Sequence, residues 1–452
     1  MLNYIKIRGC FIAVFDEDIL LYNTYTFATC IIENYKSKLK VNSVYDYYFE
    51  KNIISFFKEE NQILYDSFFS DIKTNRAIAN YYSNQFKYQR KMLITDCVSF
   101  SCNMDCVYCF EYGFSESGNE LSKDNRKKLM LKLIELYSEQ IDDIDYIFFG
   151  GEPLLHIKYI EDICRTFTKE KTEKKLSFSF TTNGTLINDK FISLCRNYNI
   201  KELRITLDGP EYIHDNRRPL KNKNGSYSKI IENIKRLCED TNTNIIINTV
   251  IDDNNYKYYI NMFDSLLAKL AKYILVEPVR IIFNIGTTCT PMLKKDESKE
   301  CFNIDGTSSN YYDLAKSLLK RGATITSPFY AGHCLNSSEK SFFISPKGDI
   351  YKCITGSNHE KFLASSYLAF FEEPMQFIKN NIVISEGSHM NKCRECEFLT
   401  ICNGGCKFQH LINGATLCRK ETIYEELPHL LDLLYIGEFD NDGNFKKRKA
   451  IY

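Results

Sequence analysis

The sequence predicts an α/β protein built around a parallel sheet, with a smaller module before it and a cysteine-rich region after it. Between about residues 90 and 290, short apolar segments alternate with longer amphipathic ones, which is typical of parallel βα units. Residues 1–90 follow a different pattern. After about residue 330 the periodicity is lost while the cysteine density rises. We therefore expect three parts, covering residues 1–90, 91–300 and 301–452.

The strands expected in the central part are short and apolar. They lie at residues 146–151, 176–184, 202–209, 244–251 and 280–285. The helices between them have apolar residues three and four positions apart, and they are expected at residues 125–140, 187–199, 227–240 and 258–273. Ligands bind at the carboxyl ends of parallel strands, so the segments FFGGEP, TTNG and LDGP should meet on one rim.

The first ninety residues predict a separate small α+β module. The segments YIKIRGCFIAVF and ILLYNTYTFATCII have the composition of strands in a hairpin or small sheet. Tyr- and Phe-rich helical sequence follows them. The module is therefore either a recognition element or a cap on the central sheet.

Composition narrows the classes of function. The chain has 452 residues, of which 44% are hydrophobic, and its 58 basic residues balance 58 acidic ones. This neutrality argues against a nucleic-acid or anionic-membrane partner. No signal peptide or membrane span is evident, so we expect a cytoplasmic protein. In a reducing compartment, the 18 cysteines indicate metal or redox chemistry rather than disulfides.

One short segment gathers three cysteines in a C-x3-C-x2-C spacing, Cys102, Cys106 and Cys109. Three thiolates on one tight loop can bind three irons of a cubane cluster and leave the fourth iron open to a substrate. A zinc site with Cys97 as the fourth ligand is the alternative. Cys97 otherwise fits as a packing residue in the strand that leads into the loop.

Several motifs together resemble radical S-adenosylmethionine (SAM) enzymes. CNMDCVYC, with Tyr108 before its last cysteine, is similar to their cluster-binding loop. GGEP, TTNGT, ITLDG and HDNRRP then occur in the family's order at or just after strand ends. The resemblance covers about residues 92–290. It implies a partial (β/α)6 TIM-like barrel, a 4Fe-4S cluster on the three cysteines, and SAM as the source of a 5'-deoxyadenosyl radical.

The resemblance also implies which residues bind SAM. Gly150, Gly151 and Glu152, followed by Pro153, would meet the methionine ammonium. Thr206 and Arg218 would hold its carboxylate, because a carboxylate suits a guanidinium and a hydroxyl. Asn183 and Asp208 are further candidates, for the ribose or for a network at the strand ends.

A second group of cysteines lies in the C-terminal region. The members are Cys334, Cys353, Cys393, Cys396, Cys402, Cys406 and Cys418. Part of this run could be a zinc ribbon. Beside a radical SAM core it resembles the SPASM extension, which implies two auxiliary 4Fe-4S clusters and three clusters in all. The second auxiliary cluster would use Cys393, Cys396, Cys402 and Cys418.

The first auxiliary cluster would use Cys334, Cys353 and Cys406, which leaves it one ligand short. Either Cys289 or Cys301 supplies the fourth thiolate, or the iron is open to a substrate thiolate.

The function that the resemblance implies is maturation of a ribosomally made precursor peptide through a thioether or carbon-carbon crosslink. The N-terminal module would bind the peptide's leader as an added strand. A flavodoxin or ferredoxin would supply electrons. One alternative is an anaerobic sulfatase maturase that forms formylglycine. The ninety residues before the cluster loop count against it, because the loop of that family lies close to the start of the chain. An alternative of another class is a non-catalytic zinc protein that serves as an interaction surface.

Overall fold

The computed structural model divides the described chain into two compact units. It describes residues 4–7, 9–26, 28–60, 62–69, 90–109, 111, 120–169, 174–276, 279–287, 304–326, 334–335, 338–357, 359–386, 393, 395–402, 405–406, 408, 418, 420–439 and 444–448. The first unit contains the described parts of residues 1–86 and 387–452, and the second contains those of 87–326 and 334–386. No described helix is long and apolar enough to cross a membrane.

The first unit joins the two ends of the sequence. Its antiparallel sheet has the order β1 (Tyr4–Ile7), β2 (Cys10–Phe15), β3 (Asp18–Asn23), β4 (Thr29–Ile32). Helices α1 (Tyr35–Leu39), α2 (Phe49–Glu60) and α3 (Gln62–Phe69) follow. The C-terminal elements are α14 (Leu399–Cys402), α16 (Lys420–Ile436), β14 (Gly437–Phe439) and β15 (Phe445–Lys447). The N-terminal strands predicted from the sequence are confirmed.

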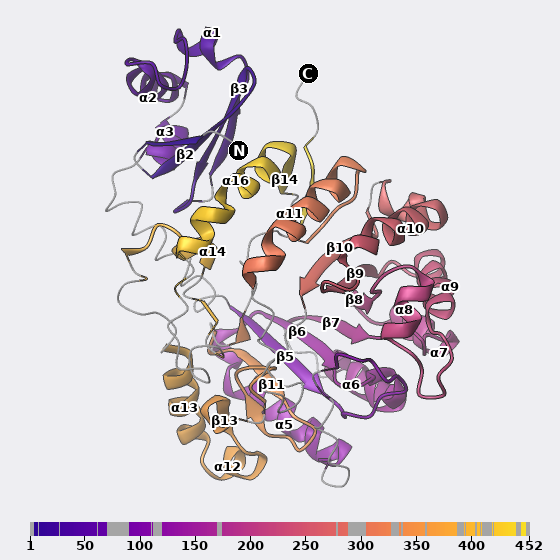
Figure 1. The fold of residues 1–452 in the computed structure, drawn as a ribbon. Helices are drawn as coiled ribbons and strands as arrows, with labels where there is room; N and C mark the ends of the chain where they lie inside the picture. Colours follow the sequence, from indigo (N-terminus) through magenta and orange to yellow (C-terminus); the bar gives the residue numbers. More distant parts are fainter. Residues whose placement is uncertain are drawn as a thin grey trace. The chain divides into compact units, whose positions relative to one another are not determined.

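Apolar residues on one face of the N-terminal sheet explain why α1 to α3 cover it. Ile12 and Leu21 of the sheet are fully buried against Phe49 and Phe57 of α2 and against Phe68 of α3. Helix α16 lies beside the same sheet, as Figure 1 shows. There the ring of Tyr435 stacks on Phe15 with 4.0 Å between centroids, and its hydroxyl donates to Asp18 at 2.9 Å.

The second unit is built on a sheet of nine described strands, which confirms the α/β prediction. Their order is β10 (Ile281–Thr287), β9 (Asn244–Ile251), β8 (Ile200–Thr206), β7 (Lys175–Thr182), β6 (Asp143–Phe149), β5 (Lys91–Cys97), β11 (Ser341–Ile344), β12 (Ile350–Tyr351), β13 (Leu363–Ser365). Strands β5 to β10 are parallel to their neighbours. This is the partial-barrel arrangement that the sequence predicted.

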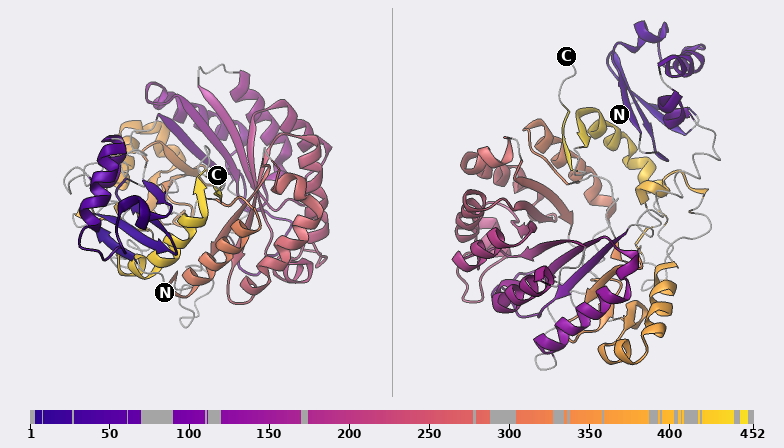
Figure 2. Two further views of the ribbon diagram at one scale, coloured as in Figure 1. Left: turned by 90° about the horizontal axis from the view of Figure 1, so that it is seen from above. Right: turned by 180° about the vertical axis from the view of Figure 1, so that it is seen from behind.

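Helices cover the outer side of the parallel strands, as Figures 1 and 2 show. They are α5 (Lys123–Leu136), α6 (Ile157–Lys169), α7 (Asp189–Asn197), α8 (Glu211–Arg217), α9 (Tyr227–Asp240), α10 (Tyr259–Ile274) and α11 (Ile304–Lys320). Short 3-10 turns η1 (Ser138–Gln140), η2 (Pro153–His156) and η3 (Tyr256–Tyr258) connect some of them. Helix α6 was not among the predicted helices.

Strand β11 extends the parallel sheet with residues from far along the chain. It pairs in parallel with β5, Ser341 opposite Leu93 and Ile344 opposite Asp96. Strands β12 and β13 then continue the sheet in antiparallel fashion. Turn η5 (Glu360–Phe362) and helices α12 (Tyr367–Glu372) and α13 (Pro374–Glu386) complete this part.

A buried ionic network ties β11 to the start of the cluster loop. Asp96 is fully buried and pairs with Arg126 of α5. It also accepts hydrogen bonds from the hydroxyls of Tyr146, at 2.6 Å, and Tyr159, at 2.8 Å. The other end of the Arg126 guanidinium donates to the carbonyl oxygen of Ser345, at 2.6 Å. All these groups are satisfied, which is what makes a charged network tolerable in a protein interior.

Candidate active site

The cluster loop follows β5 directly and lies against the end of β6. The N–H of Gly151 donates to the carbonyl oxygen of Ser99, and that of Glu152 donates to the carbonyl of Ser101, both at 2.9 Å. A Cβ on Gly151 would lie 2.5 Å from the carbonyl oxygen of Phe100 and 2.6 Å from the carbonyl carbon of Ser101. Only glycine allows the two backbones this close an approach.

The other residues of GGEP shape the turn that follows β6. Gly150 has φ +116°, which side chains of other residues rarely allow. The Glu152 carboxylate caps η2 by accepting from the N–H of Leu154 at 3.0 Å, and Pro153 occupies the first turn, where its missing N–H costs nothing. The sequence GGEP therefore forms a close backbone contact at its glycines and a capped turn after them.

The Glu152 side chain also fixes the end of β7. It accepts from the hydroxyl of Thr182 and from the N–H of Asn183, both at 2.7 Å, and is buried. Burial raises the pKa of this carboxyl, although its hydrogen bonds oppose the shift. Three donors therefore already hold Glu152. Its predicted contact with the methionine ammonium stays a prediction.

Asn183 connects the end of β7 to the cluster loop. Its side-chain amide donates to Asn103 at 2.8 Å and to the sulfur of Cys102 at 3.8 Å. The same sulfur accepts from the N–H of Met104 at 3.4 Å. These hydrogen bonds link the end of β7 to the cluster loop, and both predicted roles of Asn183 stay predictions.

The three loop cysteines lie within electrostatic reach of one another. Burial and the charge of Glu111 raise the pKa of Cys109 to about 11, and the neighbouring Cys106 and Cys102 add to the shift. Burial also raises the pKa of Cys102 and of Cys106. Within the described residues, no three Cys, His, Asp or Glu side chains form a preassembled metal site. The loop brings the thiols near one another without closing them around a point.

A second buried network joins the cluster loop to β8 and α8. The Tyr108 hydroxyl donates to Asp208, and Arg218 donates to the same hydroxyl at 2.6 Å. Asp208 is fully buried and also accepts from the N–H of Val250 at 3.0 Å. Burial raises the pKa of Tyr108 well above its usual value, which keeps the phenol protonated as the donor.

Two residues that sequence reasoning missed support this network. Arg217 pairs with Asp252 at 2.9 Å and lies 5.1 Å from the centre of the Tyr108 ring. His214 accepts from the N–H of Asp208 at 3.3 Å, and burial lowers its pKa well below the usual value. The motif HDNRRP contains both, but its spacing does not indicate which member faces inward.

The candidate SAM groups lie at the carboxyl ends of neighbouring strands. Thr206 ends β8 and is buried. Arg218 follows α8, and its charge acts on the pKa of Cys106, so the guanidinium lies near the cluster loop. The Nε atom of Arg218 is buried and has no hydrogen-bond partner in the described part of the chain.

These observations test whether the residues fit a cluster and SAM. A buried guanidinium with an unpaired donor suits a ligand carboxylate. Thiols whose pKa values are raised by burial suit a cationic cluster, because its positive charge offsets the cost of burying thiolates. The residues present therefore fit both groups.

The C-terminal cysteines are divided between the two units. Cys393, Cys396, Cys402, Cys406 and Cys418 belong to the first unit, and Cys334 and Cys353 to the second. Cys289 and Cys301 lie outside the described residues.

Three of the first unit's cysteines interact electrostatically. Burial raises the pKa of Cys396, Lys420 opposes the shift, and the charges of Cys418 and Cys393 add to it. Cys402 ends α14, where its N–H donates to the carbonyl of Phe398 at 2.8 Å. Cys418 and Cys393 therefore lie within electrostatic reach of Cys396, and their place in one ligand set stays a prediction.

Four of the other described cysteines are buried in the second unit. Cys97 ends β5 opposite Phe149 of β6 and is buried, and a Cβ on Gly150 would lie 3.1 Å from its sulfur. Cys164, Cys195 and Cys238 are buried on helices α6, α7 and α9.

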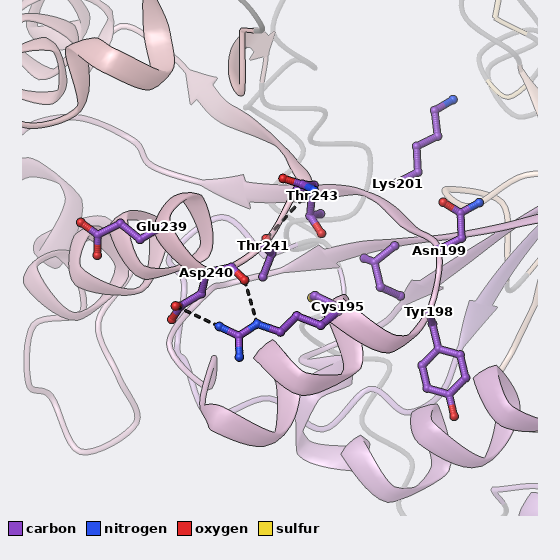
Figure 3. Close-up of a pocket in the computed structure, with 11 residues that line it drawn as sticks. Cys195, Tyr198, Asn199, Lys201, Glu239, Asp240, Thr241 and Thr243 are labelled. Carbon is purple, nitrogen blue, oxygen red and sulfur yellow. Dashed lines mark hydrogen bonds and ion pairs between the residues drawn. The ribbon is translucent and has the colours of Figure 1, made fainter.

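A cavity of about 510 Å³ opens at the opposite, amino ends of β8 and β9 (Figure 3). Its lining includes Arg196, whose guanidinium donates to the backbone carbonyl of Asp240 at 2.8 Å and pairs with its carboxylate at 3.0 Å. Ligands of parallel α/β sheets bind at carboxyl ends, so we assign this cavity no part in the site.

Substituting Gly151→Ala is expected to displace the cluster loop, because the new Cβ meets backbone atoms rather than a movable side chain. Iron and sulfide bound by the anaerobically reconstituted protein should fall, and unfolding should cost about 1–3 kcal/mol less. The matched control is Gly286→Ala in β10, where a Cβ would meet nothing closer than 3.5 Å. Equal iron content and thermal midpoint in the two variants would contradict the tight-contact argument.

The chain is similar in sequence to known proteins. Residues 97–266 match the Radical SAM superfamily. The chain is 26% identical over 334 residues to a cysteine-type anaerobic sulfatase-maturating enzyme of Clostridium novyi, covering 68% of this chain and 86% of the relative. It is 24% identical to the radical SAM cyclopropyl synthase TigE of Paramaledivibacter caminithermalis, covering 68% of this chain and 66% of TigE.

Solved structures share the fold. Native anSMEcpe with bound AdoMet and Kp18Cys peptide aligns with a TM-score of 0.56 and 18% identity, over 76% of this chain and 99% of that one. Streptococcus suis SuiB bound to S-adenosylmethionine aligns with a TM-score of 0.52 and 15% identity, over 90% of this chain and 96% of SuiB. The chain is therefore an enzyme whose residues 97–266 match the Radical SAM superfamily, and it is similar to maturases that belong to it.

Proposed function

We propose that this enzyme matures a ribosomally made precursor peptide by forming a thioether or carbon-carbon crosslink. Residues 1–90 would recognise the leader, 91–300 would generate the radical, and 301–452 would carry two auxiliary clusters. The proposal rests on one observation above others, which is the joint between the N-terminal sheet and the C-terminal cysteine segment.

That joint is built from aromatic and charged contacts within the first unit. Phe398, between the cysteines of the segment, stacks on Phe11 of β2 with 6.0 Å between centroids, and Tyr424 lies edge-on to Phe398 at 4.8 Å. Beside them Glu397 is buried and pairs with Lys6 of β1. The N-terminal sheet is thus packed against the segment that would hold a cluster.

The same sheet has strand edges to which a peptide can add. Its order places β1 at one edge and β4 at the other, and an extended peptide can pair with an edge strand through main-chain hydrogen bonds. A leader docked there would be held by the unit that also carries Cys393, Cys396, Cys402 and Cys418.

In the second unit, Cys102, Cys106 and Cys109 would bind the SAM cluster. Gly150, Gly151 and Glu152 would face the ammonium of SAM, and Thr206 and Arg218 its carboxylate. When bound, the SAM cluster and SAM would supply a 5'-deoxyadenosyl radical that takes one hydrogen atom from the peptide. The auxiliary clusters would accept the electron that is released as the new bond forms. The second hydrogen leaves as a proton.

The remaining ligands complete the proposed count of three clusters. Cys334, Cys353 and Cys406 would hold the first auxiliary cluster, with Cys289 or Cys301 as the fourth ligand or with an iron open to a substrate thiolate. A flavodoxin or ferredoxin would deliver the reducing electron.

A second candidate function is formylglycine formation on a sulfatase. Relatives described as sulfatase-maturating enzymes match 68% of this chain, and this favours the candidate specifically.

One experiment separates the two functions. The enzyme is purified without oxygen, reconstituted and reduced, then given each short cysteine-bearing peptide encoded beside its gene, and separately a synthetic sulfatase-motif peptide carrying Cys or Ser. Crosslinking predicts a peptide that loses two hydrogen atoms and forms no aldehyde. An aldehyde on the sulfatase peptide, with the neighbouring peptides unchanged, would reject the crosslinking proposal in favour of the second candidate.

A further inference from the structure

Three neighbouring strands place polar side chains in one row at the carboxyl end of the sheet. Thr206 of β8 is opposite Asn248 of β9, and Asn248 is opposite Asn284 of β10. Residues in register on parallel strands project from the same face of the sheet, so these three side chains form one row.

The row lies on the inner face, away from the helices. The preceding residue on β10, Phe283, packs on Phe263 of α10 with 5.0 Å between ring centroids. Successive side chains alternate between the two faces of a strand, so Asn284 and its row point to the inner side. That is the side on which SAM would lie in the proposed function.

Hydrogen bonds run along the row in one direction. The Thr326 hydroxyl donates to Oδ1 of Asn284 at 2.7 Å, and Nδ2 of Asn284 donates to Oδ1 of Asn248 at 2.6 Å. Nδ2 of Asn248 then donates to the hydroxyl oxygen of Thr206 at 3.4 Å. Every donor therefore lies on the Thr326 side of its acceptor.

Backbone contacts hold the first member in place. The N–H of Thr326 donates to the carbonyl of Phe283 at 2.8 Å, and that of Phe283 donates to the carbonyl of Thr324 at 2.9 Å. The donor that begins the series is thus fixed to β10 itself.

This direction decides what the Thr206 hydroxyl can do. Its oxygen accepts from Asn248, so its hydrogen is directed to another acceptor. A carboxylate can only accept hydrogen bonds, so a hydroxyl held as a donor is the form that recognises one. If the amides pointed the other way, Thr206 would donate to Asn248 and present only an oxygen.

Strand β9 also supports the second group proposed for the carboxylate. Its Val250 N–H bonds Asp208, and Asp208 holds the Tyr108 hydroxyl to which Arg218 donates. The hydroxyl and the guanidinium are therefore oriented from the same strand.

We propose that Asn248 and Asn284, with Thr326, are positioning residues that hold the Thr206 hydroxyl as a donor to the SAM carboxylate. The inference deepens the proposed function, because it rests on Thr206 and Arg218 as the carboxylate site. It does not depend on which peptide the enzyme modifies.

The test measures binding rather than turnover. Dissociation constants of the reconstituted enzyme are determined anaerobically by calorimetry for SAM and for decarboxylated SAM, which lacks the carboxylate. Asn248→Leu and Asn284→Leu should weaken SAM binding roughly three- to tenfold and change the affinity for decarboxylated SAM much less. Asn244→Leu is the matched control, because Asn244 lies on the same strand and face four residues before Asn248.

A conservative pair separates positioning from packing. Thr326→Ser keeps the hydroxyl and should bind SAM like the unaltered enzyme, whereas Thr326→Val should share the loss. Equal losses for both ligands, or unchanged SAM binding in the Asn variants, would overturn the proposal. If Thr206 and Arg218 do not bind the SAM carboxylate, the result is different. The unaltered enzyme and an Arg218→Met variant would then each bind SAM and decarboxylated SAM with similar affinity.

Discussion

Replacing Cys102, Cys106 and Cys109 together by Ala is expected to abolish SAM cleavage while the auxiliary clusters still load. The three thiols are the proposed ligands of the only cluster with a position open to SAM, and removing them leaves the C-terminal cysteines intact. The measurement combines 5'-deoxyadenosine formation with iron and sulfide content, which should fall by about one cluster of the three.

The control for this variant is Cys97→Ala. Cys97 lies just before the cluster loop and is buried next to Gly150. Its replacement should therefore preserve both iron content and SAM cleavage. Retained SAM cleavage in the triple variant would refute the ligand assignment. Loss of all iron would refute the independence of the auxiliary clusters.

Arg126→Met is expected to destabilise the second unit strongly. It leaves Asp96 fully buried with its charge uncompensated, and breaking such a pair costs about 3–5 kcal/mol of unfolding free energy. Chemical denaturation followed by circular dichroism measures the effect. The double variant Arg126→Met with Asp96→Asn should recover part of the loss, because it removes the orphaned charge.

The matched control is Arg90→Met, since Arg90 pairs with Asp142 at 2.7 Å on the surface. Both members of that pair are more than half exposed, so solvent screens them and little stability should be lost. Equal losses at Arg90 and Arg126 would show that burial does not decide the outcome.

The parallel strands and their shared rim could be predicted because their signals are local. The strand at residues 244–251 and the helix at 227–240 occur with the predicted bounds, since apolar spacing and flanking polar residues mark both. The spacing of Cys102, Cys106 and Cys109 predicted a cluster or zinc site, whereas the ligand sets of the C-terminal cysteines came from the family resemblance. Residues close together in the sequence are enough to specify these features.

What the sequence did not indicate depends on pairing between distant segments. Nothing in residues 341–344 shows that they join the sheet beside β5, because a short apolar run fits many partners. The bonds of Asn248 and Asn284 likewise require strand register, which local patterns leave open.

Glu152 shows why a motif can be recognised while the contacts of its side chain stay hidden. GGEP was predicted as a ligand-binding segment, yet three hydrogen bonds from the protein already hold this carboxylate. A cap at η2 and a bond to the next strand end both depend on the fold around it, so no spacing rule reveals them.

The pairing of β11 with β5 has a consequence for how the chain folds. Leu93 and Ser341 are far apart in sequence, so their contact closes a very long loop and forms late in folding. Until it forms, the strand that leads into the cluster loop has an open edge, which can pair with other chains. Synthesis that stops before residue 341 should therefore yield aggregates. Iron inserted before residues 341–344 are made would enter a sheet that still lacks β11.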